Sequence, residues 1–142
     1  AYTGRYLSMP LARTRIIGVQ MYMADVQGFL HWGYNFWHTK LSYDVIDPRL
    51  MTDCGCFNPS GDCFLVYPGE EGRAWESMRL NAMREAMEDI RMLELYESAF
   101  GKEATKRMLL EQSGGRLDFR VYPTEAAFFS RLRAHIMKKL LS

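Results

Sequence analysis

The sequence carries almost no net charge and no long hydrophobic run. Its net charge is +1 at pH 7 over 142 residues, so charge gives no reason to expect a nucleic acid or an anionic membrane as a partner. No apolar run approaches the roughly 18 residues that a membrane-spanning helix needs. Internal repeats and low-complexity tracts are absent, which excludes a repeat architecture. What remains is the profile of one soluble globular domain, long enough to bury a core.

Cysteine is scarce, and its spacing is not that of a familiar site. The three cysteines are Cys54, Cys56 and Cys63, and an odd number does not make a closed disulfide framework. The Cys-x-Cys spacing is not that of an ordinary zinc knuckle, and only His31 and His38 upstream could add a ligand. We therefore expect free thiols, no metal and no cofactor. One loop disulfide and a metal-binding loop remain as alternatives.

The sequence also lacks a signal-peptide pattern and does not begin with Met. Both features suit a mature protein or an excised C-terminal piece. They leave the export of a longer parent open.

An aromatic stretch from Gly28 to Trp37 is the most informative part of the chain. Residues 28–33 have the pattern of a strand that is apolar on both faces. Residues 34–62 then form a loop without clear periodicity, and loops of that length are usually functional or disordered. Its content of Tyr, Phe and Trp makes disorder the weaker alternative. Carbohydrate sites commonly combine aromatic rings, on which a sugar ring stacks, with polar partners for its hydroxyls. The alternative is a set of core aromatics with polar tips at the surface.

The spacing of apolar residues predicts four helices, over about residues 10–26, 75–100, 102–112 and 125–141. Ser8 and Thr124 are the expected N-terminal caps of the first and the last helix. A stripe at helical spacing on the longest helix should face the core: Leu80, Met83, Met87, Ile90, Leu93 and Phe100.

A second apolar run, Cys63 to Tyr67, predicts another strand. The two strands could form a hairpin with a very long loop, or a parallel pair with an irregular crossover. Two strands make no stable sheet of their own. The chain should therefore be an excised part of a larger barrel or sheet, or should complete its sheet with a partner chain.

Five blocks of the sequence follow one another in a fixed order and carry a resemblance: Gly28–Phe36, Asp47-Pro48, Pro59–Gly69, Glu76–Leu80 and Glu85–Asp89. Together they resemble the C-terminal part of a glycoside hydrolase family 123-like catalytic region, otherwise labelled a domain of unknown function. The similarity covers about residues 5–100 well and the last helices loosely.

The resemblance implies an α/β fold in which this chain is the C-terminal piece of a (β/α)8 barrel. Residues 28–33 and 63–67 would be the last two strands, and the long helix would be the last barrel helix. Residues 101–142 would be a helical extension of the same unit, residues 1–142. Active sites of such barrels lie at the C-terminal ends of the strands, here beside loop 34–62.

Characterised members of the family are retaining β-N-acetylgalactosaminidases, so the resemblance implies an N-acetylhexosaminide as substrate. In their substrate-assisted mechanism an Asp orients the acetamide and an adjacent Glu is the acid/base. No Asp-Glu pair occurs in this sequence, and Glu88-Asp89 has the reverse order in mid-helix. We therefore expect no catalytic residue in this chain, with the pair on an earlier strand of the parent.

Six residues are the candidates for contact with a sugar: Trp32, Tyr34, Asn35, Trp37, Asp62 and Tyr67. Trp32 is the candidate stacking platform, against a role as a core residue. Asn35 is the candidate hydroxyl or acetamide partner, against loop capping. Asp62 has the alternative of fixing the Ser60-Gly61 turn.

The predicted function is that of a C-terminal fragment of a glycoside hydrolase-like protein, which contributes part of a sugar pocket. Its expected partners are a carbohydrate and the rest of the parent barrel. The alternative is a non-catalytic carbohydrate-binding module or a helical protein-interaction module.

Overall fold

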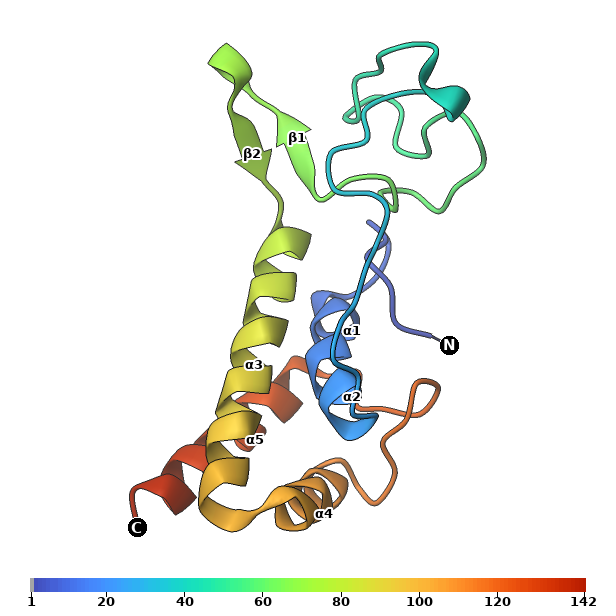
Figure 1. The fold of residues 1–142 in the computed structure, drawn as a ribbon. Helices are drawn as coiled ribbons and strands as arrows, with labels where there is room; N and C mark the ends of the chain where they lie inside the picture. Colours follow the sequence, from blue (N-terminus) through green and yellow to red (C-terminus); the bar gives the residue numbers. More distant parts are fainter. Residues whose placement is uncertain (1) are drawn as a thin grey trace.

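The computed structural model describes residues 2–142 and is rich in helix. Its elements, shown in Figure 1, are α1 (Leu11–Arg15), α2 (Ile17–Met23), β1 (Val66–Pro68), β2 (Ala74–Glu76), α3 (Met78–Phe100), α4 (Lys102–Gln112) and α5 (Ala126–Leu140), with short 3-10 turns at Lys40–Ser42 and Glu70–Gly72. Helix α3 runs as a column (Figure 1). Helices α1, α2 and α5 lie along its side and α4 lies at its C-terminal end, while the β1–β2 hairpin and the long loop lie beyond its N-terminal end.

The helix predictions are confirmed in position, and both cap predictions are wrong. The first helix is interrupted at Ile16, which divides it into α1 and α2. It begins after Pro10, and α5 begins after Glu125, and neither start has a side-chain cap. Helix α3 instead has such a cap, because the Ser77 hydroxyl accepts a hydrogen bond from the Leu80 N–H at 3.2 Å. No helix of residues 2–142 is long and apolar enough to cross a membrane.

The strand prediction for residues 28–33 is wrong. The segment is extended, but it belongs to no strand of the described chain. Phe29 is 48% exposed and Leu30 is 88% exposed, so the apolar pattern is not covered. A strand forms only where its backbone groups find a ladder partner, and nothing in residues 2–142 supplies one to this segment.

The second strand begins later than predicted and pairs differently. Strand β1 starts at Val66 and pairs antiparallel with β2, in the register Val66↔Glu76, Tyr67↔Trp75 and Pro68↔Ala74. This two-stranded antiparallel sheet replaces the expected last two parallel strands, and no barrel fragment appears within residues 2–142. The tight turn at residues 70–72 makes β2 the nearest available partner for β1.

The long loop is confirmed, and it is anchored at both ends. Asn35 and Phe64 form an isolated antiparallel bridge, and the Leu65 N–H donates to the Tyr34 carbonyl at 2.7 Å. A small core lies beneath the loop, with Cys54, Cys63 and Phe64 buried against partly buried neighbours that include Phe36, Trp37 and Tyr67. The hairpin alternative therefore describes this region better than the parallel pair, with the pairing shifted to residues that follow Gly33.

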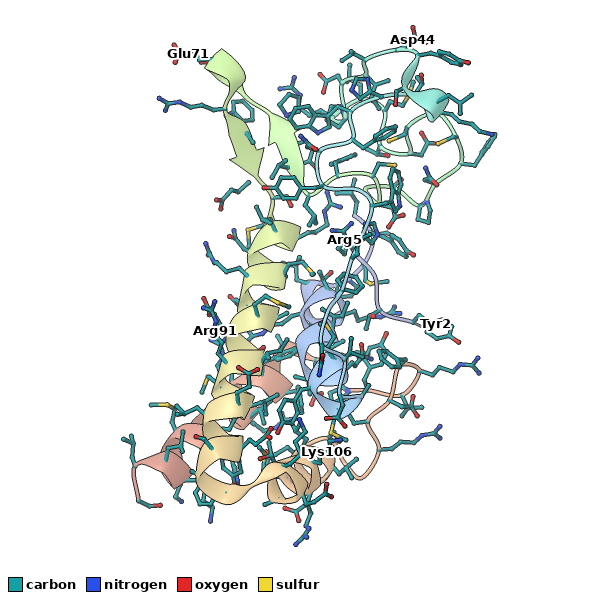
Figure 2. All side chains as sticks on the ribbon, in the orientation of Figure 1. Tyr2, Arg5, Asp44, Glu71, Arg91 and Lys106 are labelled. Atoms are coloured by element: carbon teal, nitrogen blue, oxygen red, sulfur yellow. The ribbon has the colours of Figure 1, made fainter. Side chains whose placement is uncertain are left out.

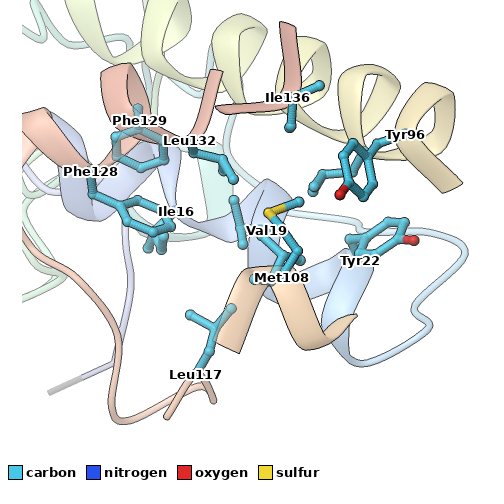
Figure 3. Close-up of a cluster of buried hydrophobic side chains, with 12 residues drawn as sticks. Ile16, Val19, Tyr22, Tyr96, Met108, Leu117, Phe128, Phe129, Leu132 and Ile136 are labelled. Carbon is cyan, nitrogen blue, oxygen red and sulfur yellow. The ribbon is translucent and has the colours of Figure 1, made fainter. Parts of the chain in front are cut away.

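The main core lies among α2, α3, α4 and α5, which supply buried residues such as Val19, Leu93, Leu109 and Ile136 (Figure 3). Helix α3 buries a different set of apolar residues from the predicted stripe, namely Ala82, Ala86 and Tyr96 together with Leu93. Leu93 is the one member of that stripe that is fully buried, while Met87 and Phe100 are exposed.

Close helix packing explains the shift of the buried stripe. A Cβ on Gly18 would lie 2.2 Å from the Ala86 carbonyl oxygen, so α2 lies directly against the α3 backbone. Only small residues allow such an approach. The larger Met83 and Met87 are therefore placed beside this contact, on the wall of an open groove.

Candidate functional site

A row of aromatic rings follows the extended segment into the loop. Ring centroids are 6.4 Å apart for Phe29 and His31, 6.2 Å for His31 and Trp32, 5.4 Å for Trp32 and Phe36, and 5.6 Å for Phe36 and His38. Trp32 lies near the middle of this row with half of its surface exposed (51%). An indole ring that is packed on two neighbours and open to solvent can serve as a stacking surface.

A polar network holds the ring next to Trp32. The His31 Nε2 lies 3.0 Å from Asp62 Oδ1, and the Gly33 N–H donates to His31 Nδ1 at 3.1 Å. The Arg5 Nη2 also contacts Nδ1 and donates to the Gly33 carbonyl at 2.7 Å. The network therefore joins the N-terminal segment, the aromatic segment and the end of the loop. In Figure 2, Arg5 lies between the helical part of the molecule and the loop.

The two arginines of this region are buried and cationic. Arg5 is 6% exposed, and burial lowers its pKa to about 10, a shift that Asp62 opposes and that Arg79 reinforces. Arg79 is buried as well, and it donates to the carbonyls of Arg5 (2.7 Å) and Gly61 (2.5 Å). Burial also lowers the pKa of Arg79. These two arginines fix the backbone on which His31 and Asp62 are placed.

A small cavity of about 190 Å³ lies beside this network, with Arg5, His31, Asp62, Thr14 and Phe29 among its lining residues. It combines polar groups with an aromatic wall, as small-ligand pockets commonly do. A larger open groove of about 870 Å³ runs between α2 and α3.

The structure divides the six predicted site residues into two groups. Trp32 and Tyr34 are each 51% exposed, and Asn35 is exposed, so these three are free to contact a ligand. The Trp37 Nε1 donates to the Val66 carbonyl at 3.0 Å, so this indole anchors the loop to strand β1. Tyr67 packs edge-on against Phe64 at 5.2 Å.

Asp62 belongs with Trp37 and Tyr67, because its carboxylate is already engaged in a hydrogen bond with His31 Nε2 at 3.0 Å. Arg5 and His31 were not among the predicted site residues. Nothing in the sequence marks Arg5, because its contacts lie 26 and 28 residues away along the chain.

Cys54 and Cys56 lie in the loop and Cys63 follows it directly, and all three are free thiols. The Asn58 amide nitrogen lies 3.0 Å from Cys56 Sγ and 3.5 Å from Cys63 Sγ. Burial is the main cause that raises the pKa of Cys54 to about 12, and it raises the pKa of Cys63 as well. Within residues 2–142, no group of three or more His, Cys, Asp or Glu side chains is placed to hold a metal ion, so the metal-binding alternative gains no support.

Residues 1–96 match the model of the glycoside hydrolase 123 catalytic domain. The chain belongs to this family. The match covers the aromatic row, the loop, the hairpin and most of α3, and the family resemblance noted in the sequence is therefore confirmed. No curated protein matches the chain.

Proposed function

We propose that this chain is the C-terminal part of a glycoside hydrolase 123 catalytic domain and forms one wall of its sugar pocket. The parent enzyme hydrolyses N-acetylhexosaminides by substrate-assisted retention, and its catalytic Asp-Glu pair lies on an earlier strand. Residues 5–100 supply the barrel elements and residues 101–142 a helical extension. The observation that carries the proposal is Trp32, a half-exposed indole packed between His31 and Phe36 in a member of this family.

The neighbours of Trp32 suit a neutral, hydroxylated ligand. Tyr34 and Asn35 follow it in the chain, and both are exposed. A phenol and an amide provide the donors and acceptors that sugar hydroxyls and an acetamide need. Tyr67, Trp37 and Asp62 hold the neighbouring backbone and ring through their contacts with Phe64, Val66 and His31.

The partner that completes this wall is the rest of the barrel. Residues 28–33 are extended and unpaired within the described chain, as the last strands of a barrel would be without their neighbours. The groove beside them exposes an apolar surface to which Met21, Val26, Phe29, Met83, Met87 and Ile90 contribute. A surface of this kind favours burial against another element.

Hydrolysis of an aryl N-acetyl-β-hexosaminide by the complete catalytic domain tests the sugar wall. Trp32→Ala should lower kcat/KM at least about tenfold, because an aromatic contact contributes on the order of 1 kcal/mol beyond its buried area. Trp75→Ala is the matched control, since Trp75 is also 51% exposed but lies on β2. Equal effects of the two substitutions would contradict the assignment of Trp32.

Substitutions on α3 test the partner. Met87 lines the groove, whereas Leu95, on the same helix, is exposed and is not part of its lining. In the complete domain Met87→Lys should lower the melting temperature more than Leu95→Lys does. In the 142-residue chain alone both substitutions should be nearly neutral. A neutral Met87→Lys in the complete domain would show that the groove remains open there.

A non-catalytic carbohydrate-binding module is the second candidate. Both candidates are compatible with the absence of an adjacent Asp-Glu pair from these 142 residues, and they differ in whether the complete protein carries that pair. Without the pair, the complete protein binds N-acetylhexosamines, with quenching or enhancement of Trp32 fluorescence, and releases no aryl alcohol from the substrate.

A further inference from the structure

We propose that Arg5, His31 and Asp62 act as positioning residues that fix the orientation of the Trp32 indole. The inference rests on the proposed function for the role of Trp32 as a sugar platform. It adds that the platform is held by a buried polar network and not by packing alone.

The hydrogen bonds of His31 define its tautomer. The Gly33 N–H donates to Nδ1 at 3.1 Å, and the Arg5 guanidinium, which has no acceptor, contacts the same nitrogen. Nδ1 must therefore be unprotonated, and Nε2–H donates to Asp62 Oδ1 at 3.0 Å. Both ring nitrogens are thus occupied by partners on three different segments of the chain, which leaves the ring one orientation.

The partners of His31 are themselves held in place. Arg5 donates to the Gly33 carbonyl at 2.7 Å, so one guanidinium fixes both the ring and the backbone that follows it. The side chains of His31 and Asp62 are only 20% and 17% exposed, which keeps most water from competing for their bond.

The fixed imidazole then sets the plane of Trp32. The two rings are nearly parallel, with an interplanar angle of 19° and centroids 6.2 Å apart. Phe36 meets the indole edge-on from another direction, at 65° and 5.4 Å. Trp37, by contrast, is held directly through its own Nε1 bond to Val66. An indole that is already ordered binds a sugar without the entropic cost of immobilising it.

The experiment uses 5-fluorotryptophan in the full chain, which gives three ¹⁹F resonances, one for each tryptophan. Single Trp→Phe variants assign them. His31→Ala and Asp62→Ala should shift and sharpen the Trp32 resonance as the indole becomes mobile, while the Trp37 and Trp75 resonances stay in place. Asp62→Asn should retain the wild-type resonance, because its amide oxygen can still accept from Nε2–H. An unchanged Trp32 resonance in both alanine variants would overturn the proposal.

The Trp37 and Trp75 resonances serve as internal references that distinguish a general folding defect from a local change at Trp32. If His31→Ala disturbs all three resonances, Asp62→Ala decides, because it removes only the contact to Nε2 and leaves the ring stack. A mobile Trp32 beside unchanged Trp37 and Trp75 supports the network, and an immobile Trp32 refutes it.

Kinetics of the complete domain separates this inference from the proposed function. Asp62→Ala should raise KM for an aryl N-acetylhexosaminide about threefold to tenfold with kcat changed less than twofold, since ordering of one side chain is lost. An unchanged KM with a mobile Trp32 would overturn the positioning role. If Trp32→Ala itself leaves KM unchanged, the proposed function fails while the ¹⁹F result on the network still stands.

Discussion

Arg15 and Asp89 are joined by two parallel hydrogen bonds across 74 residues of sequence, from Nε to Oδ2 at 2.6 Å and from Nη2 to Oδ1 at 2.8 Å. The Asp89 carboxylate also accepts from Arg133 Nε at 2.8 Å, so one acidic group connects α1, α3 and α5. The Asp89 side chain is only 1% exposed. Two guanidinium groups compensate its burial, and this geometry makes it the polar centre of the helical part.

Asp89→Asn should therefore destabilise the protein strongly. Removing one partner of a buried charge network typically costs about 3–5 kcal/mol, because the remaining charges lose their compensation. Glu88→Gln is the control, since Glu88 contacts the same Arg133 at 3.4 Å with a side chain that is 48% exposed. An exposed pair of this kind contributes less than about 1 kcal/mol. Urea unfolding measures both, and similar losses for the two variants would refute the central role of Asp89.

Gly18→Ala should destabilise the protein although alanine favours helix. The new Cβ would lie 2.2 Å from the Ala86 carbonyl oxygen, so α2 and α3 would have to separate. Overpacking of this kind typically costs about 1–3 kcal/mol. At Gly28 a Cβ would meet nothing within 4 Å, so Gly28→Ala should change the stability by less than about 0.5 kcal/mol. Thermal unfolding measures the stability of both variants. A neutral Gly18→Ala would mean that α2 and α3 are not in close contact.

One cysteine should react with thiol reagents well before the other two. Burial raises the pKa of Cys54 to about 12 and also raises the pKa of Cys63, so little thiolate forms at either near pH 8. Cys56 is only partly buried. Labelling with Ellman's reagent at pH 8 should show one fast thiol, and Cys56→Ser should abolish that phase. A fast phase that survives in Cys56→Ser would place the reactive thiol at a buried position.

Tyr22 should make the stability fall between about pH 10 and 12. Burial first, and then the hydrogen bond that its hydroxyl donates to Glu97 at 2.5 Å, raise the pKa of Tyr22 from 10.0 to about 12. Between these values the unfolded chain loses a proton that the folded chain retains, so this contribution to stability is present below pH 10 and is lost as the pH rises toward 12.

Tyr22→Phe is the variant that isolates this effect. It should lose about 2 kcal/mol less stability than the wild type between pH 9 and pH 12, since each pKa unit corresponds to about 1.4 kcal/mol. Urea unfolding at the two pH values measures the difference. A parallel decline of the two proteins would show that other groups cause the alkaline loss.

The pattern of apolar residues along the sequence predicted the helices well and the strands poorly. Helices α3, α4 and α5 satisfy their backbone hydrogen bonds within the segment, so the spacing of their apolar residues suffices to place them. Residues 28–33 have the composition of a buried strand, but a strand also needs a partner, and residues 2–142 provide none that pairs with it.

The candidate site shows the same division. Trp32, Tyr34 and Asn35 were predicted from their residue types beside an apolar run, and they are exposed together. Trp37 and Tyr67 have the same chemistry but are used to hold the hairpin and the small core. Residue type alone does not distinguish these two uses, because it does not specify which neighbours fill the space around a side chain.

The sequence by itself determined the family, because its blocks occur in a fixed order along the chain. It also determined the helices, the long loop and the aromatic stretch, because each of these depends on residues that are near one another in the chain. Only the tertiary structure decided which face of α3 is buried, which aromatics remain exposed and how Arg5 comes to contact His31. These features depend on contacts between distant segments. Such contacts are selected by close packing and by the need of buried polar groups for partners. Local sequence patterns do not predict them.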